Sequence, residues 1–133
     1  MQPRLLLDTH VLVRWLFEAK RLSREQSKLL EAAVNRTEPV AFSAVSLLEV
    51  AVLMAAGRLR LGVGLDVFFD DLRANPVFRM LPLDYDVAAE AALLSVLKDP
   101  ADRAIVATAR VHRLRLLTSD ERIVASELVA TVD

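Results

Sequence analysis

Short apolar runs alternate along the chain with longer segments in which apolar residues recur every three or four positions. Runs of this length are typical of buried strands, and the longer spacing is typical of amphipathic helices. Such an alternation predicts an α/β domain built from βαβ units, with a largely parallel sheet. The expected strands are Leu5–Leu7, Val40–Phe42, Phe78–Leu83, Leu116–Leu117 and, at an edge of the sheet, Val129–Val132.

Two of the expected helices differ in how much of their surface is apolar. The helix that starts at Ser43 or Ser46 and continues to Gly57 is apolar nearly all round, which predicts that it is buried. The segment Gly64–Ala74 carries three aspartates opposite its apolar side, which predicts a surface helix. The other helices are expected from Val11 to Leu16, from a Ser23 cap to Val34, over Asp86–Leu97, from Pro100 to His112 and over Glu121–Ser126.

The composition predicts one globular domain spanning residues 1–133. The 133 residues are 54% hydrophobic, which is enough to bury a core, and no linker-like segment divides them. The longest apolar stretch, Val45–Ala56, is about half as long as the ~20 residues of a membrane span, so we expect a soluble, cytoplasmic protein without a membrane partner. Cysteine is absent, which excludes disulfides, thiol nucleophiles and cysteine-based zinc sites, and two histidines are too few for a histidine-rich metal site.

The charge balance restricts how the chain can contact nucleic acid. A net charge of −1 excludes a global basic field, so any such contact must be local or mediated by a metal ion. Fourteen of the seventeen basic residues are arginines, whose planar guanidinium suits bidentate phosphate recognition. A bias in the base composition of the genome would give the same count.

Carboxylates lie at or just beyond the ends of two of the expected strands. Asp8 comes after Leu5–Leu7, and Asp120 comes shortly after Leu116–Leu117. Because ligands bind at the carboxyl ends of parallel strands, both acids are candidate ligands at one edge of the sheet. Each is also placed to cap the helix that follows it, a role that Ser119 could share with Asp120.

Glu49 lies inside an apolar helix, where no capping role is open to it. A buried, ionised carboxylate costs several kcal/mol unless it is paired or bound to a metal. Its position one turn from the helix start places it near the sheet edge that carries Asp8. The alternative is a glutamate on a narrow exposed stripe, or one that pairs with an arginine.

The segment Asp99-Pro100-Ala101-Asp102 has the form of a helix start, with Asp99 as the N-cap and Pro100 in the first turn. Asp102 is followed by apolar residues three, four and seven positions later, so it lies on or beside the buried face of that helix. If Asp8, Glu49, Asp102 and Asp120 converge, they form an anionic oxygen site that favours Mg²⁺ or Mn²⁺ over zinc. Such a site suits metal-assisted hydrolysis of phosphodiesters.

Four segments resemble, in order, the motifs of PIN-domain ribonucleases, and among these the VapC-type toxins of bacterial toxin–antitoxin pairs. The resemblance implies a three-layer α/β/α sandwich with a mostly parallel central sheet, and an endoribonuclease site that depends on Mg²⁺ or Mn²⁺. It also implies an RNA substrate, inhibition by a cognate small antitoxin protein, and a homodimer. The segments are Leu5–His10, Ser46–Val50, Asp99–Ala109 and Leu117–Asp120.

The resemblance assigns the acids individually. Asp8 corresponds to the first acid of the family, Glu49 to the second, Asp102 to the third and Asp120 to the more variable fourth, so all four are expected to be catalytic residues and metal ligands. The third segment departs from many relatives, since Leu97-Lys98 stand where a histidine is common and Ala101 where an aromatic is common. That departure leaves the subgroup and the RNA preference open.

Two other functional classes compete with the nuclease. A non-catalytic PIN-like binding module acting through protein docking is the alternative, and the unbroken set of acids argues against it. A haloacid-dehalogenase-like or receiver-like phosphotransfer domain is disfavoured, because Asp8-Thr9-His10 lacks a second aspartate and no lysine follows a late strand.

Several neighbouring residues have two interpretations each. Thr9 and Ser119 could hold the acids or metal-bound water, although hydroxyls beside helix starts are more often caps. Arg103 could contact RNA phosphate, or it could pair with Glu49 or Asp99. Arg14, Trp15 and Phe17 could stack on bases, but aromatic residues at helical spacing are more often core or interface, which is the interpretation we favour.

Overall fold

Five parallel strands form one sheet in the order β3-β2-β1-β4-β5 in the computed structural model, which describes residues 1–133. The first strand therefore lies at the centre, and the connections run outward from it in both directions. The strands are β1 (Leu5–Leu7), β2 (Val40–Ser43), β3 (Phe78–Leu81), β4 (Arg115–Leu117) and β5 (Thr131–Val132).

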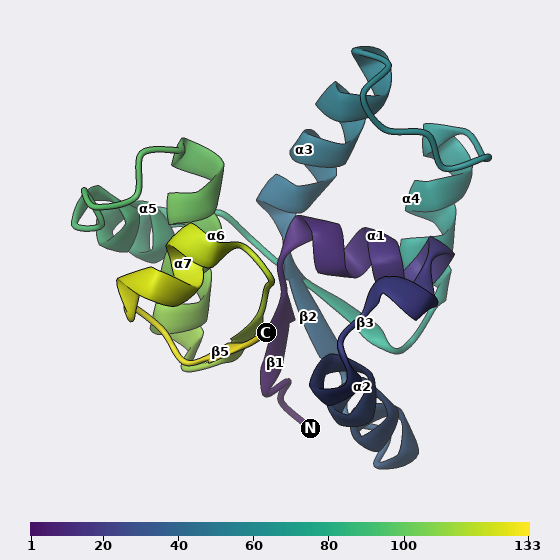
Figure 1. Ribbon diagram of the computed structural model, residues 1–133, viewed down its shortest axis with the longest axis horizontal. Coiled ribbons are helices and arrows are strands. Elements are labelled where there is room, and N and C mark those ends of the chain that lie inside the picture. The colour runs from purple at the N-terminus through teal and green to yellow at the C-terminus, as the bar shows by residue number, and fades with distance from the viewer.

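Helices cover both faces of this sheet, which confirms the expected three-layer α/β/α architecture (Figure 1). Helices α1 to α4 lie on one face, and α5 to α7 lie on the other (Figure 1). The helices are α1 (Thr9–Phe17), the 3-10 helix η1 (Ala19–Arg21), α2 (Arg24–Asn35), α3 (Ala44–Ala55), α4 (Leu65–Ala74), α5 (Tyr85–Ala92), α6 (Pro100–His112) and α7 (Glu121–Ser126).

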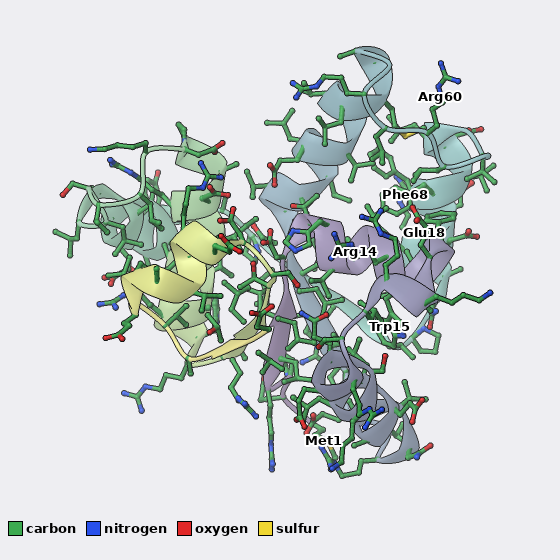
Figure 2. The ribbon with its side chains drawn as sticks, viewed as in Figure 1. Met1, Arg14, Trp15, Glu18, Arg60 and Phe68 are labelled. Atoms are coloured by element: carbon green, nitrogen blue, oxygen red, sulfur yellow. The ribbon has the colours of Figure 1, made fainter.

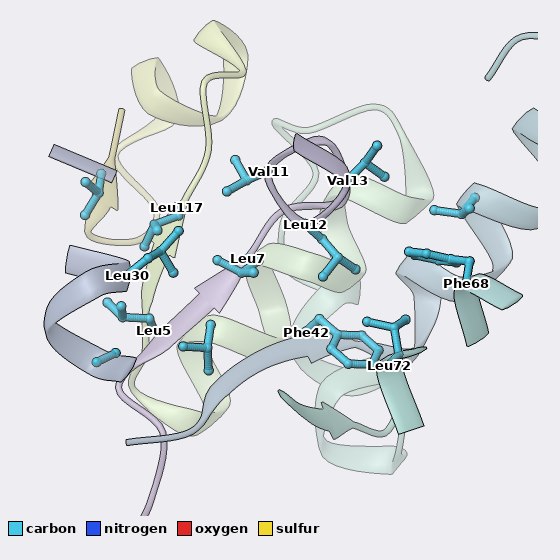
Figure 3. Packing of buried hydrophobic residues seen from close by; sticks show 14 residues of the cluster. Leu5, Leu7, Val11, Leu12, Val13, Leu30, Phe42, Phe68, Leu72 and Leu117 are labelled. Carbon is cyan, nitrogen blue, oxygen red and sulfur yellow. The ribbon is translucent and has the colours of Figure 1, made fainter. Parts of the chain in front are cut away.

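Alternation along the short strands divides the core into two clusters, because successive side chains point to opposite faces of a sheet. Leu5 and Leu7 join the cluster that includes Phe42 and Phe68 (Figure 3). Leu6, between them, packs in the cluster of α5, α6 and α7. Because both faces are covered, every residue of β1 is buried, which explains why the strand is an unbroken apolar run.

The boundaries of two elements differ from the sequence expectation. Strand β3 ends at Leu81 instead of Leu83, because Pro82 has no N–H to offer the ladder and ends the pairing. Helix α5 ends at Ala92 instead of Leu97, and the chain continues through turns that bury Leu94 and Leu97 in the core. After α5, burial of apolar residues thus occurs outside regular structure, which periodicity alone does not reveal. The remaining differences are small: β5 is two residues long, and α1 starts at Thr9.

The prediction that the apolar helix α3 is buried all round is wrong. Its only buried residues are Ser46 and Val50, whereas Leu48 is 63% exposed and Val52 is 56% exposed. The reason is that α3 projects away from the sheet, with α4 beside it (Figure 1). An apolar face that is left uncovered in one chain has the same sequence pattern as a buried one. None of the helices is both long and apolar enough to cross a membrane.

Candidate active site

A cleft of about 360 Å³ opens at the carboxyl ends of the central strands, where α1, α3, α6 and α7 begin. All four acids selected from the sequence line this cleft. Arg14 and Glu18, labelled in Figure 2, form part of its wall on the α1 side. The complete lining is Asp8, Thr9, His10, Val13, Arg14, Glu18, Arg21, Glu49, Leu53, Leu59, Asp99, Asp102, Asp120 and Arg122.

Asp8 is fixed by hydrogen bonds to both of its carboxylate oxygens. It is 5% exposed, and its Oδ1 accepts the backbone N–H of Thr9 at 2.7 Å, which makes it the N-cap of α1. Its Oδ2 accepts the hydroxyl of Thr118 at 2.6 Å, and Thr118 lies just after the neighbouring strand β4. The capping interpretation and a role in the cleft are therefore compatible for Asp8.

His10 links the same carboxylate to the β4–α7 loop. Its Nε2 accepts the backbone N–H of Ser119 at 3.1 Å, so Nδ1 carries the ring proton. Nδ1 lies 3.2 Å from Oδ2 of Asp8, so the imidazole ring contacts the carboxylate. The sequence analysis missed this role of His10 and that of Thr118, because each depends on a contact with a residue more than a hundred positions away.

Glu49 is held by a short chain of hydroxyls. The hydroxyl of Thr9 donates to Oε1 of Glu49 at 2.5 Å, and it lies 2.8 Å from the hydroxyl of Ser46. Because Thr9 has a single hydroxyl proton, Ser46 is the donor in the second contact when Glu49 is ionised. Thr9 thus holds an acid, which was one of its two expected roles, and Ser43 instead of Ser46 caps α3.

Burial raises the pKa of Glu49, and the negative charges of Asp8 and Asp99 add to that rise. The hydrogen bond from Thr9 acts in the opposite direction but does not cancel them. Glu49 is half-buried, so the deeply buried carboxylate expected from the sequence is only partly realised. It forms no ion pair with an arginine, which removes one of the alternatives for this residue.

Asp102 has a raised pKa although an arginine lies near it. Burial, followed by the charges of Asp99, Asp120 and Asp8, raises the pKa of Asp102 to about 6, against the smaller effect of Arg122. Asp99 caps α6 as predicted, since its Oδ1 accepts the N–H groups of Ala101 at 2.7 Å and Asp102 at 3.3 Å.

Asp120 differs from the other acids because it accepts hydrogen bonds from an arginine. It caps α7 through the N–H of Arg122, and Nη2 of Arg122 lies 3.1 Å from its Oδ2 and 3.7 Å from Oδ2 of Asp102. Burial alone would raise the pKa of Asp120, but the hydrogen bonds and charge of Arg122 lower it below its ordinary value. Arg122 was missed in the sequence, where only its position two residues after a capping acid hinted at it.

Arg103 forms an ion pair with neither Glu49 nor Asp99. Its Nε donates to the carbonyl of Leu97 at 2.6 Å, so it fixes the loop before α6. Trp15 and Phe17 pack against core aromatics, Phe78 and Phe68 respectively, as expected. Among the arginines on the cleft wall, only Arg122 approaches the acids of the strand ends.

The chemistry of the donors fits a hard divalent cation. The cleft offers carboxylate and hydroxyl oxygens without thiols, and burial and neighbouring acids raise the pKa values of two of its carboxylates. No three acidic or histidine side chains stand close enough together to hold an ion directly. Mg²⁺ usually keeps several waters in proteins, so these carboxylates fit it as ligands that act partly through water.

The raised pKa of Asp102 predicts that this residue destabilises the metal-free protein more as pH rises. A carboxyl with a higher pKa in the folded chain than in the unfolded chain binds protons more tightly when folded, so the free energy of unfolding falls as pH rises between the two values. Those values are 3.8 and about 6 for Asp102. With a chelator present, we expect Asp102→Asn to be more stable than the wild type by about 1 kcal/mol at neutral pH, an amount reduced by the partial exposure of the group.

The measurement is the melting temperature of both proteins across this pH range. The advantage of the variant, roughly 3 °C at neutral pH, should vanish near pH 4, where Asp102 is protonated in the folded state. Asp86→Asn, at an exposed acid outside the cleft, is the matched control. Parallel melting curves for Asp102→Asn and the wild type at every pH would contradict this account of the cleft.

Comparison with known proteins assigns this arrangement to a family. The chain is 37% identical to Ribonuclease VapC22 of Mycobacterium tuberculosis over 120 residues, which cover 89% of this chain and 88% of that protein. Its structure is similar to FitAcB of Neisseria gonorrhoeae, with a TM-score of 0.69, 26% identity and coverage of 97% and 96% of the two chains. A chain of a toxin–antitoxin complex from Klebsiella pneumoniae has the same fold, with a TM-score of 0.65, 23% identity and coverage of 96% and 95%.

The family match spans nearly the whole chain and includes every acid of the cleft. The sequence matches the family described as PIN domain over residues 5–127, a range that begins with β1 and ends after α7. With this match and the similarity to Ribonuclease VapC22, the chain belongs to the PIN-domain family.

Proposed function

We propose that this chain is an endoribonuclease that depends on Mg²⁺ or Mn²⁺ and acts as the toxin of a toxin–antitoxin pair in the cytoplasm. One observation carries the proposal: Asp8, Glu49, Asp102 and Asp120 come from four distant segments and line one cleft. A cleft of this charge repels a phosphodiester unless a cation is bound within it. The similarity to Ribonuclease VapC22 supports RNA as the substrate.

The roles of the acids follow from how each one is held. Asp8, Glu49 and Asp102 are the principal ligands for the cation, directly or through water, and Asp120 is a fourth that pairs with Arg122. A bound cation supplies a water of lowered pKa and stabilises the charge that develops at phosphorus. The chain itself holds Asp8 through Thr118 and Glu49 through Thr9, so the carboxylates are positioned before any cation arrives.

A second copy of the chain and an antitoxin are the proposed protein partners. Leu48 and Val52, exposed and four residues apart on α3, form an apolar face suited to a homodimer. A separate hollow of about 400 Å³ between α3, α4 and the edge strand β3 is lined almost entirely by apolar side chains, and it suits an apolar segment of the antitoxin. The hollow is lined by Phe42, Leu47, Phe69, Leu72, Arg73, Phe78 and Met80.

Removing a cleft carboxylate should abolish RNA cleavage. Asp8→Asn and Glu49→Gln keep the size of each side chain but remove its charge, and we expect each to lower the cleavage rate about a hundredfold or more. The measurement uses purified protein freed of bound partners, single-stranded RNA, and Mg²⁺ or Mn²⁺ in separate reactions. A chelator should have the same effect on the wild type.

The outcomes separate the two functional classes. Equal cleavage by the wild type and both variants would reject the site. A wild type that neither cleaves RNA nor binds Mn²⁺ in calorimetry would instead favour a non-catalytic binding module that acts through protein docking.

The hydroxyl of Thr9 should matter through Glu49. Thr9→Val keeps the shape of the side chain but removes the donor, and we expect cleavage to fall about tenfold, as is typical when a partner that orients a ligand is lost. Thr9→Ser keeps a hydroxyl and should restore most of the rate. Equal rates for Thr9→Val and Thr9→Ser would show that the hydrogen bond does not position Glu49.

The exposed face of α3 should hold the homodimer together. A double variant, Leu48→Lys with Val52→Lys, places two charges in the apolar contact and should raise the dissociation constant of the dimer at least about tenfold. Light scattering coupled to gel filtration measures the mass. Val67→Lys, at an exposed apolar residue of α4, should leave the mass unchanged. A wild type that is monomeric at every concentration would refute the dimer.

A further inference from the structure

A row of arginines lies at the end of the sheet where the strands begin, opposite the cleft. Arg4 directly precedes β1, and its carbonyl accepts the backbone N–H of Arg115, the first residue of β4, at 3.0 Å. Arg113 lies two residues before β4, at the end of α6. We call this row the arginine edge, and it consists of Arg4, Arg36, Arg79, Arg113 and Arg115.

The other two arginines complete the row on the far side of β1. Arg36 caps the end of α2, four residues before β2 begins, and Nη1 of Arg79, in β3, donates to the carbonyl of Met1 at 3.3 Å. Strand β3 is at the edge of the sheet, and β2, β1 and β4 follow it in order. The arginine edge therefore crosses four adjacent strands, a width of roughly 14 Å.

A single carboxylate among these residues balances only part of their charge. Glu38 is 3% exposed, and its two oxygens lie 3.3 Å from Nε of Arg4 and 3.7 Å from Nη2 of Arg36. Arg113 and Arg115 are exposed and form no ion pair. The arginine edge thus keeps a surplus of positive charge, although the whole chain has a net charge of −1.

The surplus lies at the opposite end of the strands from the acids. Because the longest strands have four residues, the two ends of the strands are separated by only roughly 13 Å. The acidic cleft repels the phosphates that flank a cleaved bond, whereas the arginine edge attracts them. Guanidinium groups also bind phosphate in a bidentate geometry that single point charges do not offer.

We propose that the arginine edge binds phosphates of the RNA substrate outside the cleft, and so supplies the attraction that the cleft lacks. This inference rests on the proposed function, because it takes RNA as the substrate. The occupant is an RNA backbone without sequence preference, since arginines on a sheet edge contact phosphate and present no groove-reading element. A row across four strands matches an extended polyanion better than a single small anion.

The test is RNA affinity measured by fluorescence anisotropy in a chelator, where no cleavage occurs. The variant Arg79→Gln, Arg113→Gln, Arg115→Gln leaves the Arg4–Glu38–Arg36 cluster intact. We expect its affinity for a long single-stranded RNA to fall about tenfold or more, and the slope of log affinity against log salt to fall by about 2, since each phosphate contact contributes roughly 0.7. Melting curves confirm that the variant is folded.

A second triple variant removes the same charge elsewhere. Arg24→Gln, Arg58→Gln, Arg60→Gln changes three exposed arginines away from the arginine edge, and Figure 2 shows Arg60 at the opposite end of the molecule from Met1. This control should retain most of the affinity. An equal loss in both triple variants would overturn the proposal, because net charge alone would then explain binding. A loss confined to duplex DNA, with RNA affinity unchanged, would also overturn it.

Cleavage of a short RNA separates this inference from the proposed function. An RNA dinucleotide has one phosphodiester bond and no flanking phosphates, so it occupies the cleft without reaching the arginine edge roughly 13 Å away. The arginine-edge variant should cleave it at the wild-type rate with Mn²⁺, while its KM for a long RNA rises. If the wild type fails to cleave either RNA, the proposed function fails; if the variant keeps the wild-type KM for the long RNA, only the arginine edge fails.

Discussion

Mutual repulsion among the carboxylates at the strand ends is the constraint around which the structure is organised. Asp8, Glu49, Asp102, Asp99 and Asp120 line one cleft, and charges of one sign at such short range disfavour the folded state. The sheet brings them together because consecutive strands are parallel and end at the same edge. Each acid must therefore be held there by local interactions that outweigh the repulsion.

Helix-capping hydrogen bonds hold three of these acids, whereas the other two lie within helices and cap none. Asp8, Asp99 and Asp120 each cap a helix, so N–H groups of α1, α6 and α7 donate hydrogen bonds to their side chains. Glu49 and Asp102 lie within helices, where backbone N–H groups are already used. These two are the acids whose pKa values rise, which identifies where a bound cation would lower the free energy of the folded protein most.

The sequence was sufficient for the parallel sheet and for the choice of the four acids that line the cleft, because apolar runs mark the strands and each acid stands where propensity or burial would not choose it. It was insufficient wherever a side chain is defined by a tertiary partner. His10 and Thr118 act on Asp8 through contacts across the sheet, and Arg122 acts through a rotamer that reaches Asp102. The exposure of α3 was also out of reach, since Leu48 and Val52 have the composition of a core. The choice between cap and ligand for Asp8 had no single answer, because its two oxygens serve both purposes.

The exposed face of α3 connects assembly to the electrostatics of the cleft. Glu49 and Val52 are three residues apart, so they lie on neighbouring parts of the same side of the helix. Burial is the largest cause of the raised pKa of Glu49 in the single chain. A second copy that covered Val52 would remove more water from this side of α3 and would raise the cost of an ionised, uncompensated Glu49 further. Under the proposed homodimer, assembly and cation binding would therefore favour each other, because the cation offsets the desolvation that the partner imposes.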